Sequence, residues 1–204
     1  MSKRYAPATE RNRDAILGVL QTYLPEQGAV LEVSAGTGQH AAFFAPRLAP
    51  RYWLPTDVDE SSLSSIQAWR ETSQASNLLA PQRLDVLDTR WQVEDTELPE
   101  PLCAMVNINM VHIAPWRCCE GLFDGAERIL PAQAVVLMYG PFRQGGEHTS
   151  PSNAAFDQQL KAQDARWGVR DLEAVIDVAK ARGFTSRAVI PMPANNLMVS
   201  FTRA

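Results

Sequence analysis

The sequence predicts an α/β fold: a doubly wound, mostly parallel seven-stranded sheet with helices on both faces and a C-terminal antiparallel hairpin. Short apolar runs alternate with amphipathic segments along most of the chain, as expected for parallel strands joined by helical crossovers. A glycine turn follows the first apolar run, and a helical pattern follows the turn. The last two apolar runs are separated only by residues 191–196. That segment is too short for a crossover, so these runs should pair as a hairpin at the sheet edge.

Composition favours an ordinary globular protein. The 204 residues carry 19 basic and 23 acidic side chains, giving a formal charge of −4, and 46% of them are apolar. We expect a single domain over 1–204, with 1–27 forming an N-terminal helical extension. Three cysteines without disulfide spacing favour a reducing, cytoplasmic compartment. No apolar run approaches the roughly 20 residues of a membrane span, residues 1–14 are too polar for a signal peptide, and the acidic balance argues against a nucleic-acid partner.

The first half of the chain should alternate helices and strands. Thr9 is suited to cap a helix with apolar residues at Ile16, Leu20 and Tyr23, and Gly28 marks its end. The other predicted elements of this half are a strand over 29–33, a helix through Ala41 and Leu48 to Pro50, a strand over 52–56, a helix through Leu63, Ile66 and Trp69, and a strand over 83–86.

The second half continues this alternation after an acidic, turn-rich segment over 88–101. The apolar run 102–108 suits a buried strand, and Leu122 and Ala126 lie on the apolar face of the next helix. The remaining predictions are a strand over 135–139, a loop rich in Gly, Pro and Ser, helices within 153–182 that include a cap at Asp171 and a stop at Gly183, and strands over 185–190 and 197–202.

The end of the first strand carries the most informative motif. Gly36 and Gly38 allow the backbone to approach a ligand closely, and Asp57 follows Gly38 by 19 residues, at the end of the second strand. A carboxylate there is suited to accept hydrogen bonds from both hydroxyls of a ribose. Asp85, which ends the third strand, is suited to an adenine amino group, with Val58 and Val86 against the ring. The pattern therefore predicts an adenosine-type ligand.

Each of these residues also has a purely structural interpretation. A glycine turn can be a tight turn without a ligand, Asp57 or Asp59 can cap the following helix, and Asp85 can be a turn residue. Glu32, Asp57 and Asp85 fall at the ends of the first three predicted strands. This combination favours a cofactor-binding site over the structural interpretations.

Glu32 distinguishes between two adenosine-type cofactors. It directly precedes the glycine turn, where a carboxylate would repel the pyrophosphate of a nicotinamide dinucleotide. The same carboxylate would attract the ammonium and sulfonium groups of S-adenosylmethionine. Asn107 is expected to line the same cofactor, and Arg11 is suited to pair with its methionine carboxylate, unless Arg11 is simply solvated in the first helix.

Nine segments of the chain carry a resemblance to a known family. They are ERNRD (10–14), LEV (31–33), GTGQHAA (36–42), PTDVD (55–59), LDV (84–86), INMVH (108–112), EGLF (120–123), YGP (139–141) and MPANN (192–196). In these segments the chain resembles class I S-adenosylmethionine-dependent methyltransferases, and more closely the methyltransferase-like protein twenty-six family. The resemblance implies a Rossmann-like methyltransferase fold, with the cofactor held by the glycine turn and by the acids after strands two and three. It brings no known substrate.

One residue departs from the general pattern of that superfamily. Ser34 stands where the first glycine of the turn is usual, and a serine fits there if its φ is negative. Among residues near the acceptor, His112 is the first choice for a general base because its ordinary pKa is close to neutrality. Asn109 is expected beside it. His112 can equally be a core or helix-capping histidine.

The sequence therefore predicts an S-adenosylmethionine-dependent methyltransferase acting on a small molecule. The alternatives are a nicotinamide-dependent oxidoreductase and a non-catalytic cofactor-binding or partner-binding module of the same fold. The three histidines show no metal-ligand spacing with one another or with carboxylates, so no metal site is expected.

Overall fold

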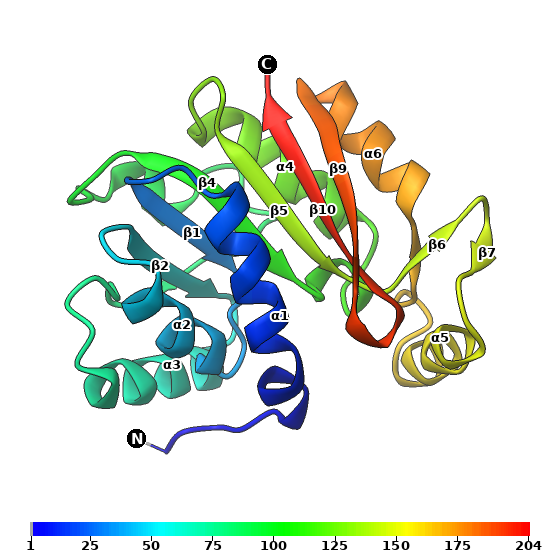
Figure 1. The fold of residues 1–204 in the computed structure, drawn as a ribbon, viewed down its shortest axis with the longest axis horizontal. Coiled ribbons are helices and arrows are strands. Elements are labelled where there is room, and N and C mark those ends of the chain that lie inside the picture. The colour runs from blue at the N-terminus through cyan, green and yellow to red at the C-terminus, as the bar shows by residue number, and fades with distance from the viewer. Residues whose placement is uncertain (1) are drawn as a thin grey trace.

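The computed structural model describes residues 2–204, and its centre is a seven-stranded sheet with the order β3-β2-β1-β4-β5-β10-β9 (Figure 1). The strands from β1 to β5 pair in parallel, and β10 is antiparallel to both of its neighbours, β5 and β9. The predicted sheet and terminal hairpin are thus confirmed. The strands are β1 (Ala29–Val33), β2 (Tyr52–Asp57), β3 (Gln82–Arg83), β4 (Leu102–Ile108), β5 (Val135–Gly140), β9 (Phe184–Met192) and β10 (Asn196–Arg203).

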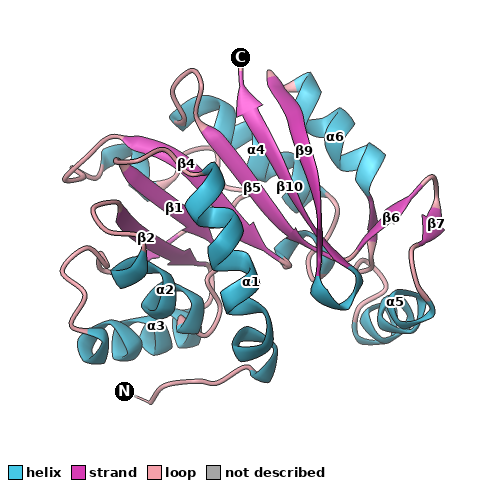
Figure 2. Cartoon of the chain, viewed as in Figure 1, coloured by secondary structure: helices cyan, strands magenta, loops and turns pink. Residues whose placement is uncertain are grey.

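Helices cover both faces of this sheet (Figure 2). One core contains Ile16 and Phe44 from the α1 and α2 side, and the other contains Phe123 and Val175 from the α4 and α6 side. The helices are α1 (Pro7–Tyr23), α2 (Gln39–Phe44), α3 (Glu60–Ser73), α4 (Arg117–Ile129), α5 (Pro151–Gln163) and α6 (Leu172–Ala181), with short 3-10 segments η1 (Ala45–Arg47), η2 (Gln92–Asp95), η3 (Met110–His112) and η4 (Pro193–Asn195).

The central strands are mostly apolar because each contributes to both cores. In β4, Met105 packs into the α4 and α6 core, while its neighbours Ala104 and Val106 pack into the α1 and α2 core. Successive side chains of a strand point to opposite faces, so a strand covered on both sides has no solvent-facing position. This is why 102–108 reads as a continuous apolar run.

The segment between β5 and α6 departs most from the sequence prediction. In place of the predicted loop before residue 153 it has β6 (Phe142–Gln144) and β7 (Glu147–His148), and β8 (Arg170–Asp171) lies between the predicted helices α5 and α6. These three strands form a second sheet with the order β7-β6-β8. Gly145 and Gly146 both have positive φ (60° and 81°), the requirement for the tightest hairpin turn. This subdomain, residues 142–171, lies beside the carboxyl end of β5 (Figure 1).

Two predicted element boundaries are wrong. The first helix begins at Pro7, with Ala6 as its N-cap in place of Thr9, because proline is preset for the first helical position. The third strand ends at Arg83. Beyond it, Leu84 and Val86 turn inward and are buried, which ends regular pairing. None of the helices within residues 2–204 combines the length and the apolar character of a membrane span.

Two helical glycines give a matched test of this packing. A Cβ on Gly125 in α4 would overlap the buried Trp91 ring, whereas one on Gly18 in α1 would meet nothing within 4 Å. We expect Gly125→Ala to destabilise the fold by about 1–3 kcal/mol through overpacking. Gly18→Ala should stabilise it by about 0.5–1 kcal/mol through helix propensity. Urea unfolding measures both, and equal effects of the two substitutions would contradict the packing described.

Candidate functional site

The glycine turn after β1 has a left-handed backbone at three positions. Ser34, Gly36 and Gly38 have φ values of 63°, 61° and 84°. Ser34 therefore does not meet the condition, a negative φ, under which a serine fits this position without strain. The cause is the hydrogen bond from the Ala35 N–H to the Thr56 carbonyl (2.8 Å), which pulls the chain toward β2 immediately after Ser34. A serine in this region pays the steric cost that a glycine avoids.

The two glycines have different reasons to be glycines. A Cβ on Gly38 would lie 2.7 Å from the Ile66 Cα, so Gly38 is required for the packing of α3 against the turn. A Cβ on Gly36 would meet nothing within 4 Å. Space above Gly36 is therefore open, and its positive φ exposes backbone to whatever enters that space.

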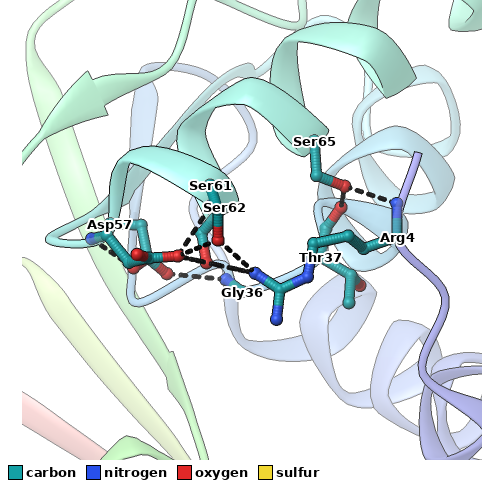
Figure 3. A network of polar contacts seen from close by, with 8 residues as sticks. Arg4, Gly36, Thr37, Asp57, Ser61, Ser62 and Ser65 are labelled. Carbon is teal, nitrogen blue, oxygen red and sulfur yellow. Dashed lines mark hydrogen bonds and ion pairs between the residues drawn. The ribbon is translucent and has the colours of Figure 1, made fainter. Parts of the chain in front are cut away.

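Asp57 fixes the shape of this turn (Figure 3). Its Oδ2 accepts a hydrogen bond from the Gly36 N–H (2.8 Å), and its Oδ1 accepts one from the Asp59 N–H (3.0 Å). Burial raises the pKa of Asp57, while these backbone hydrogen bonds oppose that shift. The side chain of Asp59 caps α3 by accepting from the Ser62 N–H (2.9 Å). Of the two carboxylates suited to cap this helix, Asp59 does so, and Asp57 is left to organise the turn.

The N-terminal segment lies across α3 next to the turn (Figure 3). The Arg4 N–H donates to Ser65 Oγ (2.8 Å), and Ser65 Oγ donates to the Thr37 carbonyl (2.7 Å). The Arg4 guanidinium donates to Ser61 Oγ (3.0 Å) and Ser62 Oγ (3.2 Å). A chain of three residues therefore links the N-terminus to the glycine turn.

A pocket of about 160 Å³ opens beside the turn, at the carboxyl ends of β1, β2 and β4. This is where ligands bind in open α/β sheets. The pocket is smaller than the roughly 300–1,000 Å³ typical of a site for a whole ligand, so it suits one ring system of a larger molecule. Its lining residues are Val33, Ser34, Val58, Leu84, Asp85, Val86, Met110, Ile113, Ala114 and Cys118.

The rim of this pocket is apolar and exposed. Val58 and Ile113 are 49% and 43% exposed, and the neighbouring Leu87 is 38% exposed. These are three of the six large apolar side chains that stand out as exposed within residues 2–204. Two of them, Val58 and Ile113, line the pocket, so a ligand bound there would cover them. Asp85 supplies a carboxylate among these apolar groups, and its Oδ1 also accepts from the Leu87 N–H (3.0 Å) as in a turn.

Four of the residues predicted to bind the cofactor line this pocket, namely Ser34, Val58, Asp85 and Val86. The other wall was not predicted from the sequence. It is formed by η3, the connection after it and the start of α4, through Met110, Ile113, Ala114 and Cys118. The apolar residues after the fourth strand were a usable signal, because that strand also ends at the binding edge.

Glu32 lies beneath the turn and does not line the pocket. It is 1% exposed, and its Oε2 accepts a hydrogen bond from Trp53 Nε1 (2.7 Å). Burial raises the pKa of Glu32 to about 8, and the nearby Asp57 charge adds to this shift. Glu32 is thus mostly protonated at neutral pH.

The two asparagines at the end of β4 and directly after it occupy separate environments. Asn107 is buried and its Nδ2 donates to the Val33 carbonyl (3.1 Å), while its Oδ1 has no hydrogen-bond partner within residues 2–204. A buried acceptor in this state is suited to a ligand or a water. Asn109 has a left-handed backbone (φ 66°) and begins η3.

His112 is part of the core rather than of an open site. It is 0% exposed, its ring packs edge-on against Phe142, and a Cβ on Gly140 would overlap it. Its Nδ1 accepts from the Arg170 N–H (3.2 Å), and burial lowers the pKa of His112 to about 3. A base that is sealed from solvent and this weak is poorly suited to take a proton from an acceptor.

His112 and Arg170 instead join the subdomain 142–171 to the pocket wall. The His112 carbonyl accepts from the Gly168 N–H (2.9 Å). Arg170 donates from Nε to the Val111 carbonyl (2.9 Å) and from Nη2 to the Ala114 carbonyl (2.6 Å). The segment 110–114, which forms one side of the pocket, is therefore held from behind by the subdomain.

A sequence profile for "Protein of unknown function (DUF938)" matches residues 3–203. The chain belongs to the DUF938 family.

Arg11, predicted to contact a carboxylate, is exposed in the first half of α1 in this DUF938 chain. Within residues 2–204 no group of three His, Cys, Asp or Glu side chains is placed to hold a metal ion.

Solved structures with the same fold include several methyltransferases. The S-adenosylmethionine-dependent methyltransferase SibL, in its apo form, matches with a TM-score of 0.75 and 16% identity over 96% of this chain and 55% of that chain. The mitomycin 7-O-methyltransferase MmcR matches with a TM-score of 0.75 and 10% identity over 97% and 54%. CalO1, a methyltransferase in calicheamicin biosynthesis with SAH bound, matches with 0.72 and 15% over 94% and 54%.

The DUF938 chain spans about half the length of these structures. At 10–16% identity, the similarity establishes a shared fold.

Glu32 gives a test of the site's electrostatics. Its folded pKa of about 8 lies above its ordinary value of 4.5, so the unfolded chain loses this proton first as the pH rises. Stability should therefore fall between pH 4.5 and 8. Glu32→Gln keeps an acceptor for Trp53 and should match the wild type at pH 4, but exceed its stability at pH 9 by about 2–4 kcal/mol. Urea unfolding at both pH values measures this difference. The exposed Glu100→Gln serves as control, and equal behaviour of the two variants at pH 9 would contradict the burial of a titrating Glu32.

Proposed function

We propose that this chain is an S-adenosylmethionine-dependent methyltransferase acting on a small molecule. The observation that carries the proposal is the pocket beside the glycine turn, where Asp85 is set among exposed apolar side chains. An adenine ring has apolar faces and a polar amino edge, which this combination complements. The methyltransferase neighbours of the same fold support the proposal.

The residues present fit the rest of the cofactor as well. Gly36 leaves open space above the turn, and each oxygen of Asp57, which holds one backbone N–H, keeps accepting capacity for ribose hydroxyls. The unpartnered Asn107 Oδ1 is a further acceptor at the end of β4. We assign Ser34, Gly36, Gly38, Asp57, Val58, Asp85, Val86 and Asn107 to cofactor binding, Glu32 to the methionine ammonium, and Arg11 to the methionine carboxylate.

Glu32 has a proton to lose before it can attract a cation. With a pKa of about 8 it is mostly neutral in the free protein. A bound ammonium would favour its ionised form, so binding should release protons below pH 8.

The structure also bears on the nicotinamide alternative. A dinucleotide places its pyrophosphate at the N-terminus of the helix after the glycine turn. Here α2 is only six residues long and continues as a 3-10 segment, which weakens the dipole that would hold a pyrophosphate. The antiparallel β10 between β5 and β9 also departs from the strand arrangement of dinucleotide-binding domains.

When bound, the cofactor supplies an activated methyl group on sulfur. The chain's part is then to position an acceptor and to exclude water. We propose that residues 1–27 cover the cofactor, in line with the contacts of Arg4 and Ser65 beside the turn. We further propose that the protein is cytoplasmic, and that this family corresponds to the methyltransferase-like protein twenty-six family. We place Asn109 near the acceptor, and we assign His112 a positioning role in place of the general base.

Isothermal titration with S-adenosylhomocysteine, S-adenosylmethionine and reduced nicotinamide dinucleotide tests this function. We expect both sulfur compounds to bind and the dinucleotide not to bind. Asp57→Ala and Asp85→Ala should each weaken S-adenosylhomocysteine binding by about 1–3 kcal/mol, the cost of a buried hydrogen bond left unmade.

Asp88→Ala is the matched control for Asp85→Ala. Asp88 lies three residues further along the same loop, forms a half-exposed ion pair with Arg83 (3.1 Å), and does not line the pocket. Its substitution should leave the affinity unchanged. Failure of both sulfur compounds to bind the folded wild-type protein would contradict the proposal, and so would binding of the dinucleotide alone.

A further inference from the structure

A second polar cluster lies on the other side of the glycine turn from the pocket. It consists of Asn12 from α1, His40 from α2 and Tyr139 from the end of β5. His40 Nε2 is 2.9 Å from Asn12 Oδ1, and the Asn12 side chain also interacts with the Tyr139 hydroxyl. His40 and Tyr139 are 9% and 3% exposed. We call these residues the Asn12 cluster.

Asn12 determines where the protons of this cluster lie. A carboxamide oxygen only accepts, so a hydrogen on His40 Nε2 must donate to Asn12 Oδ1. Burial and the nearby Arg13 charge lower the pKa of His40 to about 4, which keeps the ring neutral. His40 Nδ1 thus holds a lone pair.

His40 differs from the other two histidines in what its free nitrogen can reach. His112 Nε2 and His148 Nδ1 are buried without a partner, and the second nitrogen of each ring faces Arg170 or Asp157. His40 Nδ1 makes no hydrogen bond within residues 2–204, and it is not one of the buried polar atoms that lack a partner. Solvent therefore reaches it. Its ring is held parallel to that of Phe44, with centroids 5.2 Å apart and planes at 9°.

The sheet order places the Asn12 cluster opposite the adenine-type pocket. The pocket is lined by residues that follow β2, β3 and β4, together with Val33 and Ser34 at the end of β1. The cluster lies toward β5, and His40 is the second residue of α2, directly after the turn. A cofactor with its base in the pocket would extend along the turn toward the cluster. This step rests on the proposed function.

We propose that His40 and Tyr139, held by Asn12, bind the methyl acceptor, and that the acceptor is a neutral small molecule with a hydroxyl group. The hydroxyl donates to His40 Nδ1 and accepts from the Tyr139 hydroxyl, so that its remaining lone pair faces the methyl carbon. Asn12 is the positioning residue, because it sets the tautomer of His40.

The charges around the cluster disfavour a cationic acceptor. Its three members are neutral, and Arg13 is the charged group that acts on His40. No carboxylate among the described residues contacts His40 or Tyr139 to balance an ammonium. In the transfer, a bond forms between the hydroxyl oxygen and the methyl carbon. The carbon–sulfur bond breaks with its electron pair left on sulfur, and the hydroxyl proton leaves to water, while His40 Nδ1 orients the hydroxyl by accepting its hydrogen bond.

Nitrogen-15 NMR of the histidine rings tests the placement without any acceptor. In the free protein His40 should show the Nε2–H tautomer, and Asn12→Ala should convert it to a tautomer mixture. Glu10→Ala, at another exposed position of α1, should leave the tautomer unchanged. Of the three histidines, His40 should show the largest shift difference between the S-adenosylmethionine and S-adenosylhomocysteine complexes, which differ in the sulfonium charge.

Binding of both compounds without a shift at His40 would overturn the placement, whereas failure of both to bind would overturn the proposed function instead.

The acceptor class is tested with radiolabelled S-adenosylmethionine and an equimolar mixture of small phenols, alcohols and primary amines. We expect label in hydroxyl compounds and at least a tenfold loss of it in His40→Gln. Label in amines alone, no label in any hydroxyl compound despite cofactor binding, or full activity of His40→Gln would overturn the assignment.

Discussion

The carboxyl edge of the sheet, where the pocket opens, depends on the two hydrogen bonds that Asp57 accepts from backbone N–H groups. One oxygen holds the Gly36 N–H of the turn after β1, and the other holds the Asp59 N–H at the start of α3. The turn, the end of β2 and the cap of α3 are therefore tied to one carboxylate. Gly38 completes this arrangement because its missing Cβ lets α3 pack directly on the turn. An acid that shapes the turn in this way is also left facing the space above Gly36.

A second set of contacts brings distant segments to the same edge. Arg170, His112 and Gly168 fasten the subdomain 142–171 to the segment that walls the pocket. On the opposite side, Arg4 and Ser65 fasten the N-terminus to α3 and the turn. The pocket therefore lies between elements that are far apart in sequence. A substitution in either set of contacts should affect ligand binding indirectly, through the backbone carbonyls that these contacts hold.

The sequence was sufficient for features that depend on local rules. Alternating elements and the short 191–196 connection predicted the parallel sheet and its hairpin, and the strand-end rule brought Ser34, Val58, Asp85 and Val86 to one pocket. Features that depend on distant partners were not predictable in this way. The burial of His112 follows from Arg170, 58 residues away, and Ser34 takes a positive φ because Ala35 bonds to β2. Single-sequence patterns carry no information on such pairings.

A crystal structure of the full chain grown with S-adenosylhomocysteine tests the proposed cofactor site most directly. We expect the adenine ring to lie between Val58 and Ile113, with its amino group bound to Asp85. The ribose hydroxyls should bind Asp57, and the sulfur should point toward His40. A ligand bound elsewhere, or one whose base lies outside this pocket while its sulfur points away from the Asn12 cluster, would contradict it.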